Sequence, residues 1–129
     1  MKIIIETKPY NEMRYPTLGD YEYGEDGILN ITVADTGNDD FNWCIALHEF
    51  IEEKMTRKHG IKEGDITKFD LWVEEEIKKG NYPDDAEPGD HPFCIYKKEH
   101  QFSENIERLC AYELEMKWND NNEIKKPLK

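Results

Sequence analysis

Histidine and glutamate occur at helical spacing in two segments of this chain. In the first segment, His48 is followed directly by Glu49 and, four residues after the histidine, by Glu52. Residues four apart lie on one face of an α-helix, so His48 and Glu52 can hold one ion while Glu49 points to its side. Zinc accepts imidazole nitrogen and carboxylate oxygen as ligands. This segment therefore predicts part of a metal site.

A second histidine is followed by glutamates at the same spacing. His100, Glu104 and Glu107 stand at i, i+4 and i+7 and share one stripe of a helix. We expect His100 to join His48 and Glu52 in one ligand set, with Glu104 as a fourth ligand or as a partner that orients one. A small rotation of the helix exchanges Glu104 and Glu107, so the residues alone leave that choice open.

The acidic composition supports a second interpretation of these residues. The chain has 29 Asp and Glu among 129 residues, so a glutamate at any chosen spacing is common. His48 can also be a histidine at the edge of the core, hydrogen-bonded to a backbone carbonyl without any ion. His91 can approach a metal from an acidic, proline-rich loop, although its position favours a surface role. The metal site and its metal-free alternative both remain open at this point.

Three predicted helices must position these groups. Residues 43–59 carry apolar side chains at helical spacing and are followed by Gly60, and acids at the end of the loop 35–40 can cap this helix. Residues 65–79 predict a second helix, whose buried side comprises Ile66, Phe69, Trp72, Val73 and Ile77. Residues 98–118 predict a third helix, whose core stripe comprises Phe102, Ile106, Leu109 and Leu114.

The other segments predict a small sheet and connecting loops. Residues 3–7 form a β-branched run, and the segments 21–23 and 28–33 flank a glycine-rich turn typical of a hairpin. Residues 81–92 read as an irregular loop, and 93–96 as a short extended piece. We expect an α+β fold, with a small antiparallel sheet in the N-terminal third packed against three helices. One domain over residues 1–118 would be followed by a polar tail over 119–129.

Charge and cysteine usage narrow the classes of function. The net charge of −12 opposes a sequence-independent grip on nucleic acid or on an anionic membrane, and it suits a metal ion or a basic protein partner. No stretch approaches the length of a transmembrane helix. The three cysteines form no CxxC pair, which favours a reducing cytoplasm over a disulfide-stapled secreted protein.

The segment Ile31–Asp35, followed by Ala46-Leu47-His48-Glu49, resembles zincin-like metallopeptidases of the ImmA/IrrE, gluzincin-like type. The resemblance implies a zinc ion, a peptide or protein substrate, His48 as a ligand, and Glu49 as the general base that takes a proton from water activated by the ion. It also implies an acidic ligand from a later helix, to which Glu104 or Glu107 would correspond. This chain departs from the family pattern in having H-E-x-x-E where the family has H-E-x-x-H.

Two other classes of function stay open. The pairs Glu49/Glu52 and Glu104/Glu107 have the E-x-x-E spacing of magnesium-dependent nucleotide pyrophosphohydrolases of the MazG type. A non-enzymatic acidic interaction module, either unrelated or a degenerate zincin, is the third class. It would bind no stoichiometric metal. Metal preference separates the classes, because imidazole ligands select zinc-like ions and an all-carboxylate site favours magnesium.

Overall fold

The sheet has three strands, β1 (Ile3–Lys8), β2 (Gly19–Tyr23) and β3 (Leu29–Ala34), with β3 in the middle. β2 and β3 form the predicted antiparallel hairpin. β1 instead runs parallel to β3, so the sheet is mixed and the prediction of an antiparallel sheet is wrong for this strand. The period-two pattern of a strand identifies its faces but not its direction, which depends on the path of the connecting chain.

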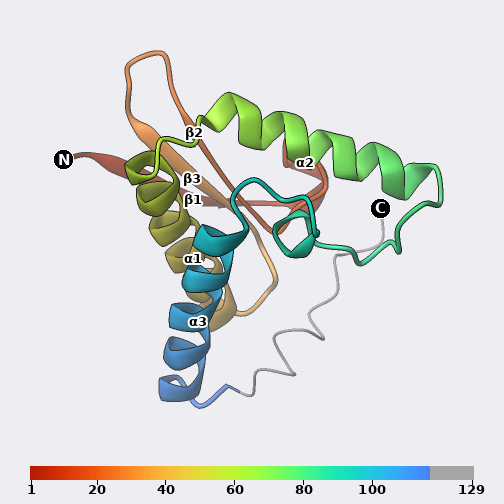
Figure 1. Ribbon diagram of the computed structural model, residues 1–129. Helices are drawn as coiled ribbons and strands as arrows, with labels where there is room; N and C mark the ends of the chain where they lie inside the picture. Colours follow the sequence, from red (N-terminus) through yellow and green to blue (C-terminus); the bar gives the residue numbers. More distant parts are fainter. Residues whose placement is uncertain (117–129) are drawn as a thin grey trace.

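Three helices accompany the sheet: α1 (Asp39–Lys58), α2 (Glu63–Lys78) and α3 (Lys97–Glu113). Two short 3₁₀ turns, η1 (Tyr10–Glu12) and η2 (Pro88–Asp90), lie in the connections. In this computed structural model, which describes residues 1–116, α1 and α3 lie side by side, and α2 runs from near the top of α1 toward the right of the view (Figure 1). The α+β class is as predicted. α3 ends at Glu113, so the prediction of a helix that continues beyond this residue is wrong for residues 114–116, while residues 117–118 and the predicted tail (119–129) lie outside the described residues.

Helix boundaries follow local capping. α1 begins at Asp39 rather than at Trp43, because the side chain of Asn38 accepts a hydrogen bond from the backbone N–H of Phe41 at 3.2 Å. Gly60, with φ +74°, ends this helix as predicted. Residues 93–96 form turns rather than an extended piece. Among the described residues, no helix is long and apolar enough to cross a membrane.

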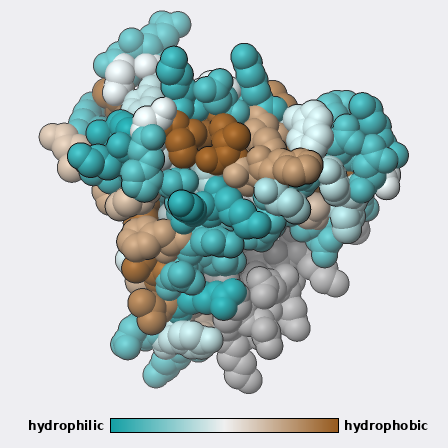
Figure 2. Space-filling model, viewed as in Figure 1, coloured by the Kyte–Doolittle hydropathy of each residue, from teal (hydrophilic) through white to brown (hydrophobic). Residues whose placement is uncertain are grey.

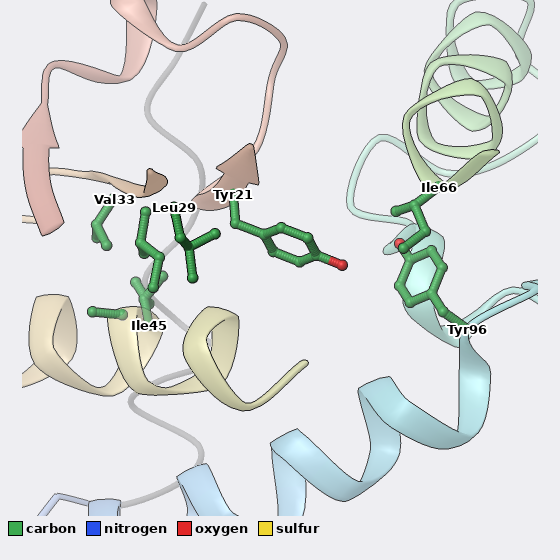
Figure 3. Close-up of a cluster of buried hydrophobic side chains, with 8 residues drawn as sticks. Tyr21, Leu29, Val33, Ile45, Ile66 and Tyr96 are labelled. Carbon is green, nitrogen blue, oxygen red and sulfur yellow. The ribbon is translucent and has the colours of Figure 1, made fainter. Parts of the chain in front are cut away.

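The hydrophobic core lies between one face of the sheet and α1. Figure 3 shows Leu29 and Val33 of β3 beside Ile45 of α1, with Tyr21 pointing from β2 toward a second group formed by Ile66 and Tyr96. Burial of each such side chain stabilises the fold by roughly 1.5–3 kcal/mol. The core of the described residues also includes partly buried side chains, namely Ile3, Leu18, Ile61, Phe69 and Cys94.

α3 buries its polar side, contrary to the prediction. Phe102 and Leu109, expected in the core, are 47% and 63% exposed. The buried positions are Glu99, Ser103, Glu107 and Ala111. An apolar stripe usually faces the core because its burial is favourable, so the inversion needs polar partners on the neighbouring helix. α1 supplies these partners.

α2 follows its predicted pattern more closely. Ile66, Val73 and Ile77 are buried, and Phe69 is partly buried. Trp72 is 41% exposed, so its predicted place in the core is wrong. Its ring instead packs near His91 and Tyr82, over the loop that follows the helix.

Candidate metal centre

The polar faces of α1 and α3 meet at three side chains that converge on one point. His48 Nε2 lies 3.0 Å from Glu52 Oε2 and 3.2 Å from His100 Nδ1, and His100 Nδ1 lies 3.0 Å from the same Glu52 oxygen. His48 and Glu52 are buried, and His100 is partly exposed. The structure thus brings together the three residues that we predicted as a ligand set, at the predicted place between the first and third helices.

The triangle formed by these three atoms matches the size of a zinc coordination shell. Ligand atoms about 2.0–2.1 Å from a tetrahedral ion are about 3.3–3.4 Å apart. The observed edges of 3.0, 3.0 and 3.2 Å would therefore need to widen by only a few tenths of an ångström. Two nitrogens and one carboxylate oxygen are a donor set that zinc accepts. The residues fit a zinc-like ion.

If no metal ion is bound, at least one contact among His48 Nε2, His100 Nδ1 and Glu52 Oε2 is unfavourable, whichever ring nitrogens carry protons. If both ring nitrogens carry hydrogens, the two N–H groups crowd each other while both point at one oxygen. If one of them lacks its hydrogen, its lone pair faces another acceptor. A cation between the three atoms satisfies all of them at once.

The charges of the cluster are strongly coupled. Burial would raise the pKa of Glu52, but hydrogen bonds from His100 and His48 outweigh burial and lower it to about 2. Burial would lower the pKa of His48, but hydrogen bonds to Glu107 and Glu52 raise it well above its ordinary value. The two flanking carboxylates thus favour the protonated form of His48 when no ion is bound. A metal ion would replace the proton on Nε2.

Glu107 orients His48 from the opposite side. Its Oε1 lies 2.8 Å from His48 Nδ1, and both side chains are buried. A histidine ligand commonly donates its second ring N–H to a carboxylate, which fixes the ring and increases the basicity of the ligating nitrogen. Both glutamates of the open choice lie near a predicted ligand, since Glu107 contacts His48 and Glu104 groups with Asp90 and His100.

The η2 turn braces His100. Asp90 Oδ1 lies 3.6 Å from His100 Nε2. Gly89 packs directly on the imidazole, and a Cβ added there would lie 2.3 Å from ring atom Cγ. Only a glycine lets the backbone approach the ring this closely. The sequence predicts only an irregular loop over residues 81–92, since no pattern in the chain pairs this turn with His100.

Glu49 stands beside the triangle and faces a cleft. It shares this cleft with His48, Glu52 and His100, and the free volume of about 60 Å³ is enough for a few water molecules. Gly19 of β2 approaches it so closely that a Cβ there would lie 2.6 Å from Glu49 Oε1. Burial, followed by the charge of Glu52, raises the pKa of Glu49 well above its ordinary value, although His48 opposes the shift.

The far wall of the cleft is a buried polar network that the sequence did not reveal. Asp70 of α2 accepts hydrogen bonds from Tyr96 Oη at 2.6 Å and from Tyr15 Oη at 3.1 Å. Arg14 binds Asp20 through two nitrogens, at 2.5 and 2.9 Å. Burial raises the pKa of Asp70 to about 7, and the two tyrosine hydrogen bonds only partly oppose it. These residues come from separate elements and share no spacing that could have indicated the network.

The two remaining histidines lie outside the triangle. His91 is buried, not on the surface as predicted, and its ring meets the rings of Phe69, Trp72, Tyr82 and Phe93. His59 caps the end of α1 and lies 2.8 Å from Glu99 of α3. Comparison with known proteins found no family model, curated protein or solved structure that matches this chain.

Proposed function

We propose that this chain is a zincin-like, metal-dependent hydrolase that cleaves peptide bonds. The observation that supports the proposal most directly is the convergence of His48, Glu52 and His100 within hydrogen-bond distance, with Glu49 beside them in a water-sized cleft. Three protein ligands with a further position left for water or substrate are typical of a catalytic zinc site, whereas a structural site has four.

The proposed chemistry divides between the ion and the chain. A zinc-like ion would polarise the carbonyl of the substrate and lower the pKa of water. Glu49 would accept a proton from that water and return it to the leaving amine. By accepting a hydrogen bond from His48 Nδ1, Glu107 would leave Nε2 available to the ion, and the lack of a side chain at Gly19 leaves room for the carboxylate of Glu49.

A peptide substrate is supported by the strand that borders the cleft. β2 is an edge strand, and its residues Gly19, Asp20 and Tyr21 line the cleft. An extended peptide can pair with such an edge through its backbone. The carbonyls of Gly19 and Tyr21 now accept hydrogen bonds from Thr17 and Arg14, so an entering peptide would replace these side-chain donors with backbone donors.

The ligand chemistry argues against the magnesium-dependent pyrophosphohydrolase. Two imidazole nitrogens occupy the ligand triangle, and imidazole favours zinc-like ions over magnesium. We also propose a reducing, cytoplasmic setting, since the cysteines Cys44, Cys94 and Cys110 are all free. The acidic surface, mostly hydrophilic in Figure 2, suits a basic protein as substrate or partner and opposes nucleic acid and anionic membranes.

The decisive experiment measures metal and activity separately. Untagged protein purified without chelator should carry about one zinc-like ion per chain by mass spectrometry, and a His48→Ala, His100→Ala double variant should carry none. Glu49→Gln should keep the ion and lose hydrolysis of an unfolded, fluorescently labelled protein by at least about 100-fold. Glu113→Gln, at an exposed glutamate at the end of α3, serves as a matched control and should change neither quantity by more than a few-fold.

Three outcomes would contradict the proposal. Absence of metal from wild-type protein, even after zinc is offered, would leave the cluster as a purely structural hydrogen-bond network and favour the acidic interaction module. Undiminished hydrolysis by Glu49→Gln would remove its assigned role. Bound metal with no hydrolysis of any unfolded protein or peptide would refute the peptidase while leaving the metal site intact.

A further inference from the structure

The outer edge of β1 is an unpaired and apolar part of the sheet. β1 lies at the edge opposite β2, and none of the described strands pairs with its outer side. Four of its six residues are exposed, and Ile4 and Ile5 are 40% and 55% exposed. Proteins usually protect an edge of this kind with charges, prolines or covering segments, because it readily pairs with another strand.

An apolar groove runs beside this edge. It lies between β1 and α1, has a volume of about 290 Å³, and includes Ile5, Val33 and Leu47. Trp43 and Phe50 of α1 border it and are 52% and 36% exposed. A partner strand that paired with β1 would therefore bring its own side chains over an apolar surface next to the edge.

The hydrogen bonds within the sheet show which backbone groups of β1 are available. The carbonyl of Lys8 accepts a hydrogen bond from the N–H of Asp35 at the end of β3, at 2.8 Å. Because backbone direction alternates along a strand, Glu6 and Ile4 also face β3. The N–H and C=O groups of Ile3 and Ile5 therefore point outward. Any antiparallel partner must place its own outward-facing residues opposite these two.

The sequence of this edge complements itself in one antiparallel register. If a second copy pairs about Ile4, Ile3 lies opposite the partner's Ile5, and Lys2 lies opposite the partner's Glu6. The two-fold symmetry repeats each pair. Both Ile3–Ile5 pairs then join outward-facing backbone groups, while the central Ile4 pair is the non-hydrogen-bonded kind. Charge and backbone geometry agree on this register.

The neighbouring antiparallel registers place like charges opposite each other. Pairing about Ile5 sets Lys2 opposite the partner's Lys8 and Ile4 opposite the partner's Glu6. Pairing about Glu6 keeps the same backbone geometry but sets two glutamates face to face. Directly opposed like charges destabilise a strand pair, and opposite charges stabilise it.

We propose that a second copy of this chain pairs with β1, so that two three-stranded sheets join into one six-stranded sheet with a two-fold axis at Ile4. The interface is isologous, since each copy offers the same strand and the same groove. Side chains of Ile3 and Ile5 lie on the α1 face of the sheet and would be covered together with the two grooves. The candidate metal centre lies at the β2 edge and stays accessible, so this inference does not depend on the proposed function.

Charge reversal tests the register. Sedimentation of untagged wild-type chain should give a mass of twice 15.3 kDa. Lys2→Glu or Glu6→Lys alone should raise the dimer dissociation constant about 10- to 100-fold, because each reversal makes two attractive pairs repulsive. The double exchange should restore the dimer, and a mixture of the two single variants should form heterodimers. Lys8→Glu, on the same strand but opposite no charged residue, is the matched control and should leave the mass unchanged.

A cross-link provides an independent readout. Ile4→Cys should give a disulfide-linked dimer on mild oxidation, since the Cα atoms of a central non-hydrogen-bonded pair are about 4.5 Å apart, within disulfide range. Wild type and Lys8→Cys should not cross-link. A wild-type chain that stays monomeric at every soluble concentration would overturn the proposal. A dimer that is indifferent to both charge reversals would also overturn it, by placing the interface elsewhere, for example on the exposed face of α3.

Discussion

Replacement of Gly89 by alanine should abolish tight zinc binding without changing any ligand. A Cβ at this position would lie 2.3 Å from Cγ, 2.4 Å from Nδ1 and 2.5 Å from Cδ2 of His100. Nonbonded carbon atoms in contact stay about 3.5–4.0 Å apart, so the ring or the η2 turn must move by about 1 Å. Gly89 does not have a positive φ, so the substitution acts through the ring and not through backbone strain.

The magnitude follows from how strictly a metal fixes its ligands. Ligand distances hold to about 0.2 Å, and loss of a group that merely orients a ligand weakens binding about 10- to 100-fold. Displacement of His100 by about 1 Å should therefore raise the zinc dissociation constant at least about 100-fold. The measurement is a titration of chelator-stripped protein with zinc, in competition with a chromophoric chelator.

Two comparisons separate this effect from general damage. Gly64→Ala adds the same methyl group where nothing lies within 4 Å. It should leave zinc affinity unchanged and, because Gly64 lies in α2 and alanine favours helix, leave the melting temperature equal or slightly higher. In a His100→Ala background the ring is gone, so Gly89→Ala should have no further effect on zinc affinity. Zinc affinity of Gly89→Ala within about threefold of wild type, in a folded protein, would show that the η2 turn yields and would refute the role of Gly89 in positioning His100.

Three further perturbations test the parts of the site one at a time. Gly19→Ala should push the carboxylate of Glu49 away and lower kcat/KM for peptide hydrolysis about 10- to 100-fold, while zinc affinity stays unchanged. Activity equal to that of wild type would show that Glu49 does not need this positioning. Glu107→Gln should weaken zinc binding about 10-fold, measured by the same titration, because the amide makes His48 a less basic ligand. Asp70 has a pKa raised to about 7, so between about pH 4 and pH 7 the folded chain keeps a proton that the unfolded chain releases. The free energy of unfolding of wild type should therefore fall across this pH range, by up to about 4 kcal/mol relative to Asp70→Asn. Chemical denaturation across this pH range checks the last prediction, and parallel stability profiles for the two proteins would contradict it.

The sequence alone predicted that His48 and Glu52 lie on one helix face, because helical periodicity is local. His48 and Glu52 share a face of α1 through the geometry of one helical turn, whatever surrounds them. His100 could be paired with them only as an expectation, supported by the repetition of a His-x-x-x-Glu pattern on a later helix. The hairpin of β2 and β3 was equally local, since a glycine-rich turn joins its two strands.

Long-range packing decided the features that periodicity could not. Hydrophobic spacing predicted that α3 would bury Phe102 and Leu109. α3 buries Glu107 instead, because its carboxylate forms a hydrogen bond with His48 of α1. The parallel direction of β1 also depended on the path of the chain and not on its strand pattern.

Local sequence therefore determined which residues lie on one helix face and where the hairpin turns. Only the tertiary structure decided that Gly89 braces His100, that Gly19 confines Glu49, and that Asp70 forms the opposite wall. Gly19 and Glu49 lie far apart in the chain, and Gly89 and His100 belong to different elements, so each contact exists only once the elements have packed.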